Sequence, residues 1–438
     1  MNILYYHQHF STPKGATGTR SYEFAQKLIK RGHAVTIVCG SYWIAETGLT
    51  GVFVRGQRTG TVDGIKVIEL ELEYSNSDSF LWRTFIFFLY SLQGIKIALK
   101  ENYDILFATS TPLTAGIPGI IAKIFRRKPF IFEVRDLWPE LPKAMKVITN
   151  PIILKLMDWL ETVSYKTATA CIGLSPGIVD GIKKKTPNKK LAMVPNGCDL
   201  NLVYNVTKNT KDKKLIAVFT GAHGFANGLD AVLDAAKILI QKGENGIEIQ
   251  FIGDGVLKPK LIKRVEVENI TNCKFIDPMP KDDLFTYLQK EANVGLMILD
   301  NIPAFYFGTS PNKFFDYIAL GLPVINNYPG WLAEMITDNN CGLAITPRNP
   351  EAFSEALIKM KSDRKSLVRM GQNAKQLAAS KFDRNKLSDQ FVDFLETKTC
   401  FSCDSQNGDL CLCTGAGARR QPVTSRSTRA QTRTADPL

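Results

Sequence analysis

Strand-like and helix-like segments alternate along almost the whole of this chain. Short, mostly apolar runs such as Asn2–Tyr6 and Val35–Cys39 are separated by stretches such as Arg20–Arg31, whose apolar residues recur at helical spacing. Parallel strands need a crossover connection, and a helix is its usual form. The alternation therefore predicts an α/β protein with parallel sheets and helices on both faces.

A polar stretch divides the alternation into two halves of similar size. Residues 201–214 are rich in Lys and Asn and show no periodicity, which is typical of an interdomain linker. A second series begins at Leu215–Thr220. We expect two doubly wound, Rossmann-like domains, over 1–200 and 201–398, and a separate tail over 399–438. Ligands bind beyond the carboxyl ends of such strands, so we expect the site in a cleft between two facing sheet edges.

Charge and composition narrow the classes of partner. The formal net charge of +13 favours anionic ligands or surfaces. Because the basic residues are dispersed and no recognised motif is present, we do not expect a nucleic-acid partner. No apolar run approaches the ~20 residues that a spanning helix needs. Met1 leads directly into a strand pattern, so we expect no signal peptide and a cytoplasmic protein with reduced cysteines.

Two glycine-rich loops each follow a predicted strand and precede a predicted helix. Glycines let backbone amides approach a phosphate, and a helix N-terminus adds positive partial charge. The spacing is neither the dinucleotide fingerprint nor a P-loop, and a tight turn without a ligand would explain the first loop equally well. We hypothesise that both loops hold one diphosphate, with His223 donating a hydrogen bond. The candidate residues in these loops are Gly15, Thr17, Gly18, Gly221 and His223.

Four charged residues occur between 133 and 140, directly after a predicted buried strand. Catalytic groups gather at such carboxyl edges. Arg135 could brace a leaving phosphate with its bidentate fork, and Asp136 could accept a proton or bind a sugar hydroxyl. The structural alternative is an ion pair that caps the domain.

The segment 308–317 combines a helix start with an unusually placed cation. Pro311 suits the beginning of a helix, and Asn312 follows it. Lys313 then falls in the first turn, where a lysine opposes the helix dipole unless an anion is bound. Asp316 lies on the same helix face and could hold ribose hydroxyls. The segment therefore predicts a phosphate ligand, although a surface helix with a chance Lys/Asp pair is the alternative.

Taken together, these four segments resemble the family 4 retaining glycosyltransferases, which have the GT-B fold. The similarity runs in order from Met1 to about Glu396. Within the family, the chain looks most like the N-acetyl-L-fucosaminyltransferases of bacterial O-antigen and capsule assembly. The segments that carry the likeness are Gly15–Arg20, Val134–Glu140, Gly221–Asp230 and Thr309–Asp316.

The resemblance implies a UDP-sugar donor bound mainly by the second domain. The acceptor would be a lipid-pyrophosphate-linked sugar bound by the first domain, and the transfer would retain configuration. It implies no cofactor and no metal, and no metal-ligand spacing occurs before the tail. Stabilisation of the leaving phosphate would be the main catalytic contribution.

The chain departs from the family pattern at five positions. Gly308 and Asp316 stand where the family has glutamates, and Ala222 and Asn227 stand where it has an arginine and a lysine. Arg135 replaces a common histidine. The basic diphosphate clamp must then be rebuilt from other residues. The cations that we expect in it are Arg20, Arg135 and Lys313.

An aromatic segment suggests contact with a membrane surface. Phe80–Tyr90 is rich in aromatic residues and is followed by Lys96 and Lys100, a combination typical of an interfacial helix. A core helix of the first domain is the equal alternative. Residues 111–127, followed by Lys128, form a second candidate. We expect a peripheral protein on the anionic cytoplasmic face of the inner membrane.

Other functions remain open at this point. A UDP-sugar 2-epimerase can share this fold, and a non-catalytic UDP-sugar-binding scaffold would fit the departures from the family pattern. The tail is expected to be disordered or a non-native remnant, with a zinc site as the less favoured alternative. Its cysteines are Cys400, Cys403, Cys411 and Cys413.

Overall fold

The computed structural model describes residues 1–75, 78–203 and 214–399. The span Met1–Thr399 forms one compact unit. Most of the predicted linker and the cysteine-bearing tail lie outside the described residues. The predictions of a linker, of a disordered tail and of zinc there are therefore untested.

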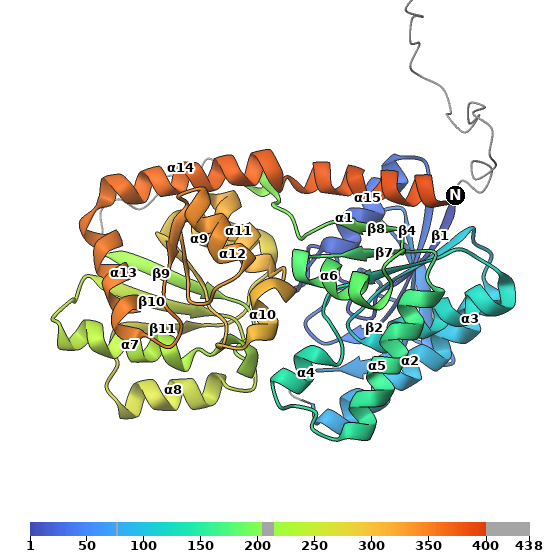
Figure 1. Ribbon diagram of the computed structural model, residues 1–438, viewed down its shortest axis with the longest axis horizontal. Helices are drawn as coiled ribbons and strands as arrows, with labels where there is room; N and C mark the ends of the chain where they lie inside the picture. Colours follow the sequence, from blue (N-terminus) through green and yellow to red (C-terminus); the bar gives the residue numbers. More distant parts are fainter. Residues whose placement is uncertain (76–77, 204–213, 400–438) are drawn as a thin grey trace, which may run out of the picture. The chain divides into compact units, whose positions relative to one another are not determined.

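The first half is built on an eight-stranded sheet in the order β3-β4-β2-β1-β5-β6-β7-β8 (Figure 1). All neighbouring pairs are parallel except β3 and β4, which form an antiparallel hairpin. The strands are β1 Asn2–Tyr6, β2 Ala34–Tyr42, β3 Gln57–Val62, β4 Ile65–Tyr74, β5 Ile105–Thr109, β6 Phe130–Val134, β7 Ala170–Gly173 and β8 Leu191–Met193. The helices are α1 Arg20–Lys30, α2 Phe80–Lys100, α3 Ile117–Arg126, α4 Glu140–Ala144, α5 Pro151–Thr167 and α6 Pro176–Lys185.

The second half is built on a six-stranded, wholly parallel sheet in the order β11-β10-β9-β12-β13-β14. The strands are β9 Leu215–Thr220, β10 Ile247–Ile252, β11 Cys273–Ile276, β12 Val294–Met297, β13 Val324–Asn326 and β14 Gly342–Ala344. The helices that follow β9 are α7 Asp230–Gln241, α8 Lys258–Val267, α9 Lys281–Glu291, α10 Pro303–Gly308, α11 Asn312–Leu320, α12 Trp331–Asp338, α13 Pro350–Ser362, α14 Arg364–Lys381 and α15 Arg384–Thr399. The predicted α/β class with two doubly wound sheets is confirmed.

Strand order places the two glycine-rich loops at equivalent points. β1 lies between β2 and β5, and β9 lies between β10 and β12. In a doubly wound sheet, a crevice opens where the strand order reverses, and ligands bind there. The loops after β1 and β9 begin at these two reversal points, so each half presents its natural binding edge.

Helices cover both faces of the first sheet because each strand turns alternate side chains to opposite faces. Leu4 and Tyr6 of β1 pack with α2, α3, α5 and α6, whereas Ile3 and Tyr5 pack with α1 and α15. The last helix of the chain thus completes the core of the first half. In Figure 1, α15 lies beside α1, so the last helix of the chain packs on the first half rather than on the second half that precedes it in sequence.

Phe391 is the central contact of α15. Its ring is fully buried, stacks on Phe24 with ring centroids 4.2 Å apart, and meets Phe107 edge-on at 5.1 Å. Burying a side chain of this size stabilises the folded protein, because its apolar surface leaves water and packs closely against its neighbours.

Substituting Phe391→Ala should lower the free energy of unfolding by about 3–5 kcal/mol, since it removes a buried ring and leaves a cavity. Urea denaturation of the full chain measures the change. Val368→Ala on α14 is the matched control because Val368 is 61% exposed, so it should stay within about 0.5 kcal/mol of the parent. Equal effects of the two substitutions would contradict the packing described for α15.

Candidate functional site

A cleft of about 720 Å³ lies where the binding edges of the two sheets meet. Loops after β1 and β2 line it from the first half, and loops after β9, β10 and β11 line it from the second half together with the start of α11. The predicted site residues that line the cleft are Thr17, Gly18, Gly221, Asn312, Lys313 and Asp316. These residues come from three of the four segments that the sequence singled out.

The first glycine-rich loop touches the second half directly. A Cβ atom on Gly18 would lie 2.8 Å from Nδ2 of Asn312, so the loop and the start of α11 approach closely here. Gly15 does not line the cleft. Its own Cβ position lies 2.2 Å from Oγ of Ser11, which makes it a packing residue of the loop rather than a phosphate contact.

Arg20 is not available to a phosphate, and its prediction as a clamp residue is wrong. The guanidinium group is 2% exposed and forms an ion pair with Glu133, whose nearest oxygen lies 2.8 Å from Nη2. It also donates to the carbonyl oxygens of Val194 and Pro195, both at 2.7 Å. Arg20 thus ties α1 to β6 and to the end of β8. Because Glu133 is distant in sequence, the spacing of residues around Arg20 did not indicate this ion pair.

The second glycine-rich loop is shaped by close backbone contacts. Gly221 has φ of +116°, and Gly253 has φ of +142°. A Cβ atom on Gly253 would lie 2.1 Å from the carbonyl oxygen of Gly221. Only glycine permits this approach, and it brings the loops after β9 and β10 together at the cleft.

His223 does not line the cleft, so its predicted hydrogen bond to phosphate has no support in the structure. Its ring is fully buried among Phe219, Phe251 and Phe275, with centroids 6.0–6.3 Å away. Neither ring nitrogen has a hydrogen-bond partner among the described residues. Burial lowers the pKa of His223 to about 4, so the imidazole is neutral near pH 7.

Lys313 lies in the first turn of α11 and lines the cleft. Its Nζ donates to Oδ1 of Asn227 at 3.0 Å and sits 3.8 Å from the ring centroid of Phe219. No carboxylate in the part of the chain that the structure describes forms an ion pair with it. Burial lowers the pKa of Lys313 to about 7. The cleft therefore holds a cation that only neutral groups contact.

Asn227 positions this lysine. Its Nδ2 donates to the carbonyl oxygen of Ala222 at 2.7 Å, which leaves Oδ1 directed to Lys313. Asn227 stands where the resembled family has a lysine. The structure thus places Lys313 of α11 beside Asn227, a relation that sequence spacing could not show.

A buried charge cluster at the base of the cleft escaped the sequence reasoning. Nζ of Lys281 lies 3.2 Å from Oδ1 of Asp316 and also contacts Asp199, while Nη2 of Arg384 donates to Asp199 at 3.0 Å. Burial alone would raise the pKa of Asp199, but Arg384 and Lys281 bring it to about 2. Burial raises the pKa of Asp316 despite Lys281. Of these residues, the sequence indicated only Asp316 as a site residue, because it lies in the segment 308–317.

Arg135 and Asp136 lie at the carboxyl edge of the first sheet but do not line the cleft. Nη1 of Arg135 is 3.3 Å from Nε2 of His7, and Asp136 accepts from Oγ1 of Thr111 at 3.2 Å. Burial raises the pKa of Asp136. The structure does not bring Arg135 together with Lys313, so the predicted three-cation clamp is not assembled. The catalytic roles of this pair stay predictions.

The two residues just before α11 lie where the second half contacts the first half. Pro311 is the cap position of the helix and does not itself line the cleft. The neighbouring Ser310 accepts a hydrogen bond from the backbone N–H of Asn196 at 3.0 Å, and its carbonyl oxygen accepts from the Asn196 side chain at 2.5 Å. Ser310 therefore links the start of α11 to Asn196 of the first half, and the role predicted for Pro311 stays a prediction.

Comparisons with known proteins agree with this architecture. Residues 15–197 match the glycosyl transferase 4-like domain, and residues 205–377 match glycosyl transferases group 1. The chain is 23% identical over 170 residues to the amylovoran biosynthesis glycosyltransferase AmsK of Erwinia amylovora. That alignment covers 39% of this chain and only 41% of the relative.

Solved structures are similar over most of the chain. The sucrose-phosphate synthase of Thermosynechococcus elongatus has a TM-score of 0.70 and 14% identity, covering 90% of this chain and 98% of that one. Anabaena Alr3699/HepE in complex with UDP-glucose has a TM-score of 0.63 and 15% identity, covering 91% and 100%. These likenesses establish the GT-B fold that the sequence predicted. The two family matches, one in each half of the chain, support a family 4 glycosyltransferase.

Proposed function

We propose that the chain transfers a sugar from a UDP-sugar to a lipid-linked saccharide with retention of configuration. The observation that carries this proposal is the pair Lys313 and Asp316 on α11, which line one cleft between both halves. A lysine without an acidic partner suits a diphosphate, and a carboxylate one turn further along suits ribose hydroxyls. The related structure with UDP-glucose supports a nucleotide-sugar donor.

Catalysis would depend on stabilising the leaving diphosphate. As the bond between the sugar carbon and the phosphate oxygen breaks, negative charge grows on the diphosphate. Lys313 and the backbone of the loops at Gly18 and Gly221 stand where they can stabilise that charge. The acceptor oxygen would form the new bond to the sugar carbon, and its proton would pass to the leaving diphosphate. We assign Arg135 and Asp136 to the acceptor side, because they lie at the edge of the first sheet outside the cleft.

The finer assignment follows the resemblance stated from the sequence. We infer that the donor sugar is an N-acetylated amino or deoxy sugar, as in the N-acetyl-L-fucosaminyltransferases. We also infer a role in O-antigen or capsule synthesis, and the similarity to the amylovoran biosynthesis glycosyltransferase supports a role in polysaccharide assembly. The transfer would need neither a cofactor nor a metal.

Turnover tests the proposal directly. The full chain should release UDP when it is given the correct UDP-sugar and a lipid-pyrophosphate-linked sugar, and the product should retain configuration by NMR. Lys313→Ala should raise the apparent donor binding constant about 10–100-fold, since it removes a charge-assisted contact worth about 1.5–3 kcal/mol. Lys365→Ala is the matched control, because Lys365 also stands in the first turn of a helix but is exposed on α14. An unchanged constant in Lys313→Ala would remove this lysine from the phosphate site.

Proton uptake gives an independent test of Lys313. With a pKa near 7 in the free protein, the Lys313 side chain is mostly the neutral amine at pH 8. A bound diphosphate favours the charged form and raises that pKa, so UDP binding at pH 8 should take up close to one proton, and affinity should fall as the pH rises above 7. Titration calorimetry in two buffers with different ionisation heats measures the uptake.

The terminal phosphate of UDP titrates near pH 6 and is fully ionised at pH 8, so it adds little to that signal. Lys313→Met is the control because it keeps the length of the side chain without an ionisable group. The same uptake in the parent and in Lys313→Met would show that another group titrates.

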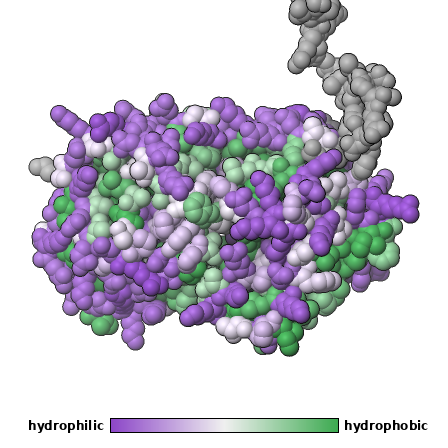
Figure 2. Space-filling view, viewed as in Figure 1, coloured by the Kyte–Doolittle hydropathy of each residue, from purple (hydrophilic) through white to green (hydrophobic). Residues whose placement is uncertain are grey.

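We further propose that the first half rests on a membrane surface. Among the described helices, none is long and apolar enough to cross a bilayer. α2 buries one face in the core, as the core-helix interpretation requires, but exposes another. Figure 2 shows hydrophobic residues gathered over the side where α2, α3 and α5 lie. The exposed apolar residues on these helices include Leu81, Phe85, Phe88, Phe125, Leu156 and Trp159.

Basic residues accompany this surface. Lys123, Arg126, Arg127 and Lys128 stand at the end of α3 next to the exposed Phe125. Apolar tips beside basic groups are what an interfacial protein presents to anionic headgroups. This supports a peripheral position on the cytoplasmic face of the inner membrane, as the sequence led us to expect.

Vesicle binding tests the membrane proposal. The full chain should sediment with vesicles that contain phosphatidylglycerol, and binding should weaken with salt. Trp159→Ala should weaken it several-fold, since Trp159 on α5 is 60% exposed. Trp43→Ala is the matched control because Trp43 is equally exposed but lies at the cleft. Binding to neutral vesicles alone, or equal loss in both variants, would overturn the proposal.

A further inference from the structure

A second cavity adjoins the cleft on the first half. This outer pocket has a volume of about 490 Å³ and is formed by the residues that follow β2 and β4 together with the start of α2. Tyr42, Trp43 and Ser75 line both the outer pocket and the cleft. A molecule that occupies the outer pocket would therefore reach the site proposed for sugar transfer.

Backbone hydrogen bonds hold the wall of the outer pocket in place. The N–H of Ala16 donates to the carbonyl oxygen of Ile44 at 3.0 Å, and the N–H of Thr12 donates to that of Glu46 at 2.8 Å. The N–H of Trp43 donates to Tyr74 at 3.3 Å. The wall is thus tied both to the first glycine-rich loop and to the end of β4, which gives a preformed site.

Aromatic rings are concentrated at this pocket. Tyr42 and Tyr74 lie inside with ring centroids 5.3 Å apart, and two tryptophans stand at the rim. Trp43 is 60% exposed and Trp82 is 49% exposed. An exposed indole offers a large flat apolar face with negative electrostatic potential. The C–H groups on one face of a pyranose ring fit such a surface.

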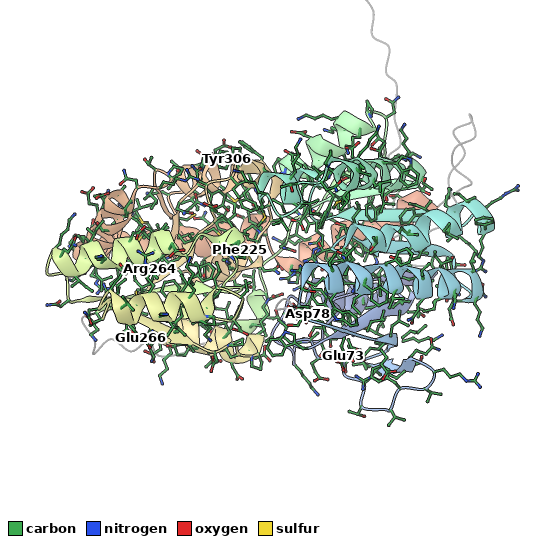
Figure 3. The ribbon with its side chains drawn as sticks, turned by 90° about the horizontal axis from the view of Figure 1, so that it is seen from below. Glu73, Asp78, Phe225, Arg264, Glu266 and Tyr306 are labelled. Carbon is green, nitrogen blue, oxygen red and sulfur yellow. The ribbon has the colours of Figure 1, made fainter. Side chains whose placement is uncertain are left out.

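Carboxylates provide the polar contacts. Glu46, Glu73 and Asp78 line the pocket, and Figure 3 shows the last two next to each other on the first half. Ionised carboxylates only accept hydrogen bonds, so they suit hydroxyl and amide donors. They also repel phosphates and uronates. The lining thus favours a ligand that is rich in donors and carries no negative charge.

One carboxylate is already committed to the fold. Glu69 is buried and accepts from Arg58 at 2.9 and 3.0 Å and from Oγ1 of Thr47 at 2.6 Å. Its charge is balanced within the pocket wall, and so is the charge of Arg58. The remaining carboxylates therefore dominate the potential that a ligand meets.

From these observations we infer that the outer pocket binds a neutral saccharide portion of the acceptor, with one sugar ring stacked on Trp43. The inference rests on the proposed function, because it assigns the second substrate of the same reaction. The acidic lining disfavours anionic lipid headgroups as occupants of this pocket, since carboxylates repel them. It also places the charged pyrophosphate of the acceptor outside the outer pocket.

A glycan array of neutral and uronate-containing saccharides tests the inference with the full chain. We expect the chain to retain neutral saccharides and to reject the uronates. Trp43→Ala should weaken retention at least tenfold, because aromatic anchors dominate such contacts. Trp43→Phe should keep most of it. Trp159→Ala, equally exposed but distant from the pocket lining, should leave retention unchanged.

Circular dichroism shows that each variant is folded, and protection from heating by UDP reports on the donor site. Retention that is unchanged in Trp43→Ala, a preference for uronates, or no retention of any neutral saccharide would overturn the inference. If the chain turns over UDP-sugars but retains no saccharide, only this inference fails. If it retains saccharides through Trp43 but never releases UDP, the proposed function fails and the saccharide site remains.

Discussion

The contact of Asp199 with Arg384 and Lys281 is the interaction on which the arrangement of the cleft most depends. Asp199 stands where the chain leaves the first half, and Arg384 stands where α15 returns to it. Lys281 begins α9 of the second half and extends the network to Asp316 in the cleft. Removing one partner of such a buried network leaves an uncompensated charge, which is far more costly than losing an exposed ion pair. The same groups thus fix both chain crossings and the carboxylate proposed for the ribose.

Lys313 has no acidic partner among the described residues, and this feature carries the proposed binding of a diphosphate. Its neighbours are the amide of Asn227 and the ring of Phe219, which offer a dipole and a π face but no counter-charge. An incoming anion has no internal counter-charge of Lys313 to displace, and it favours the charged form of the side chain. The three-cation clamp expected from the sequence is not assembled, and we propose that Lys313 and the glycine-lined backbone hold the diphosphate instead.

Much of the fold could be predicted from the sequence because it depends on local patterns. Apolar runs such as Leu215–Thr220 and Ile247–Ile252 coincide with β9 and β10. The hairpin of β3 and β4 was not predicted, since β3 is polar and half-exposed and carries no buried-strand signal. Individual site residues were harder to predict. Lys313 was recognisable from its conflict with the helix dipole, whereas the burial of Arg20 depends on Glu133 and that of His223 on three phenylalanines. Such partners meet only in the folded chain.

The return of α15 has a consequence for how the protein can be divided. Sequence order suggests that the first half ends near residue 200, yet Phe391, Val392 and Leu395 are part of its apolar interior. A fragment cut at that boundary would expose the stripe on α1 and β1 that these side chains cover. The N-terminal half therefore cannot complete its core without the last helix of the chain. A version of that half made on its own needs this helix fused back to it.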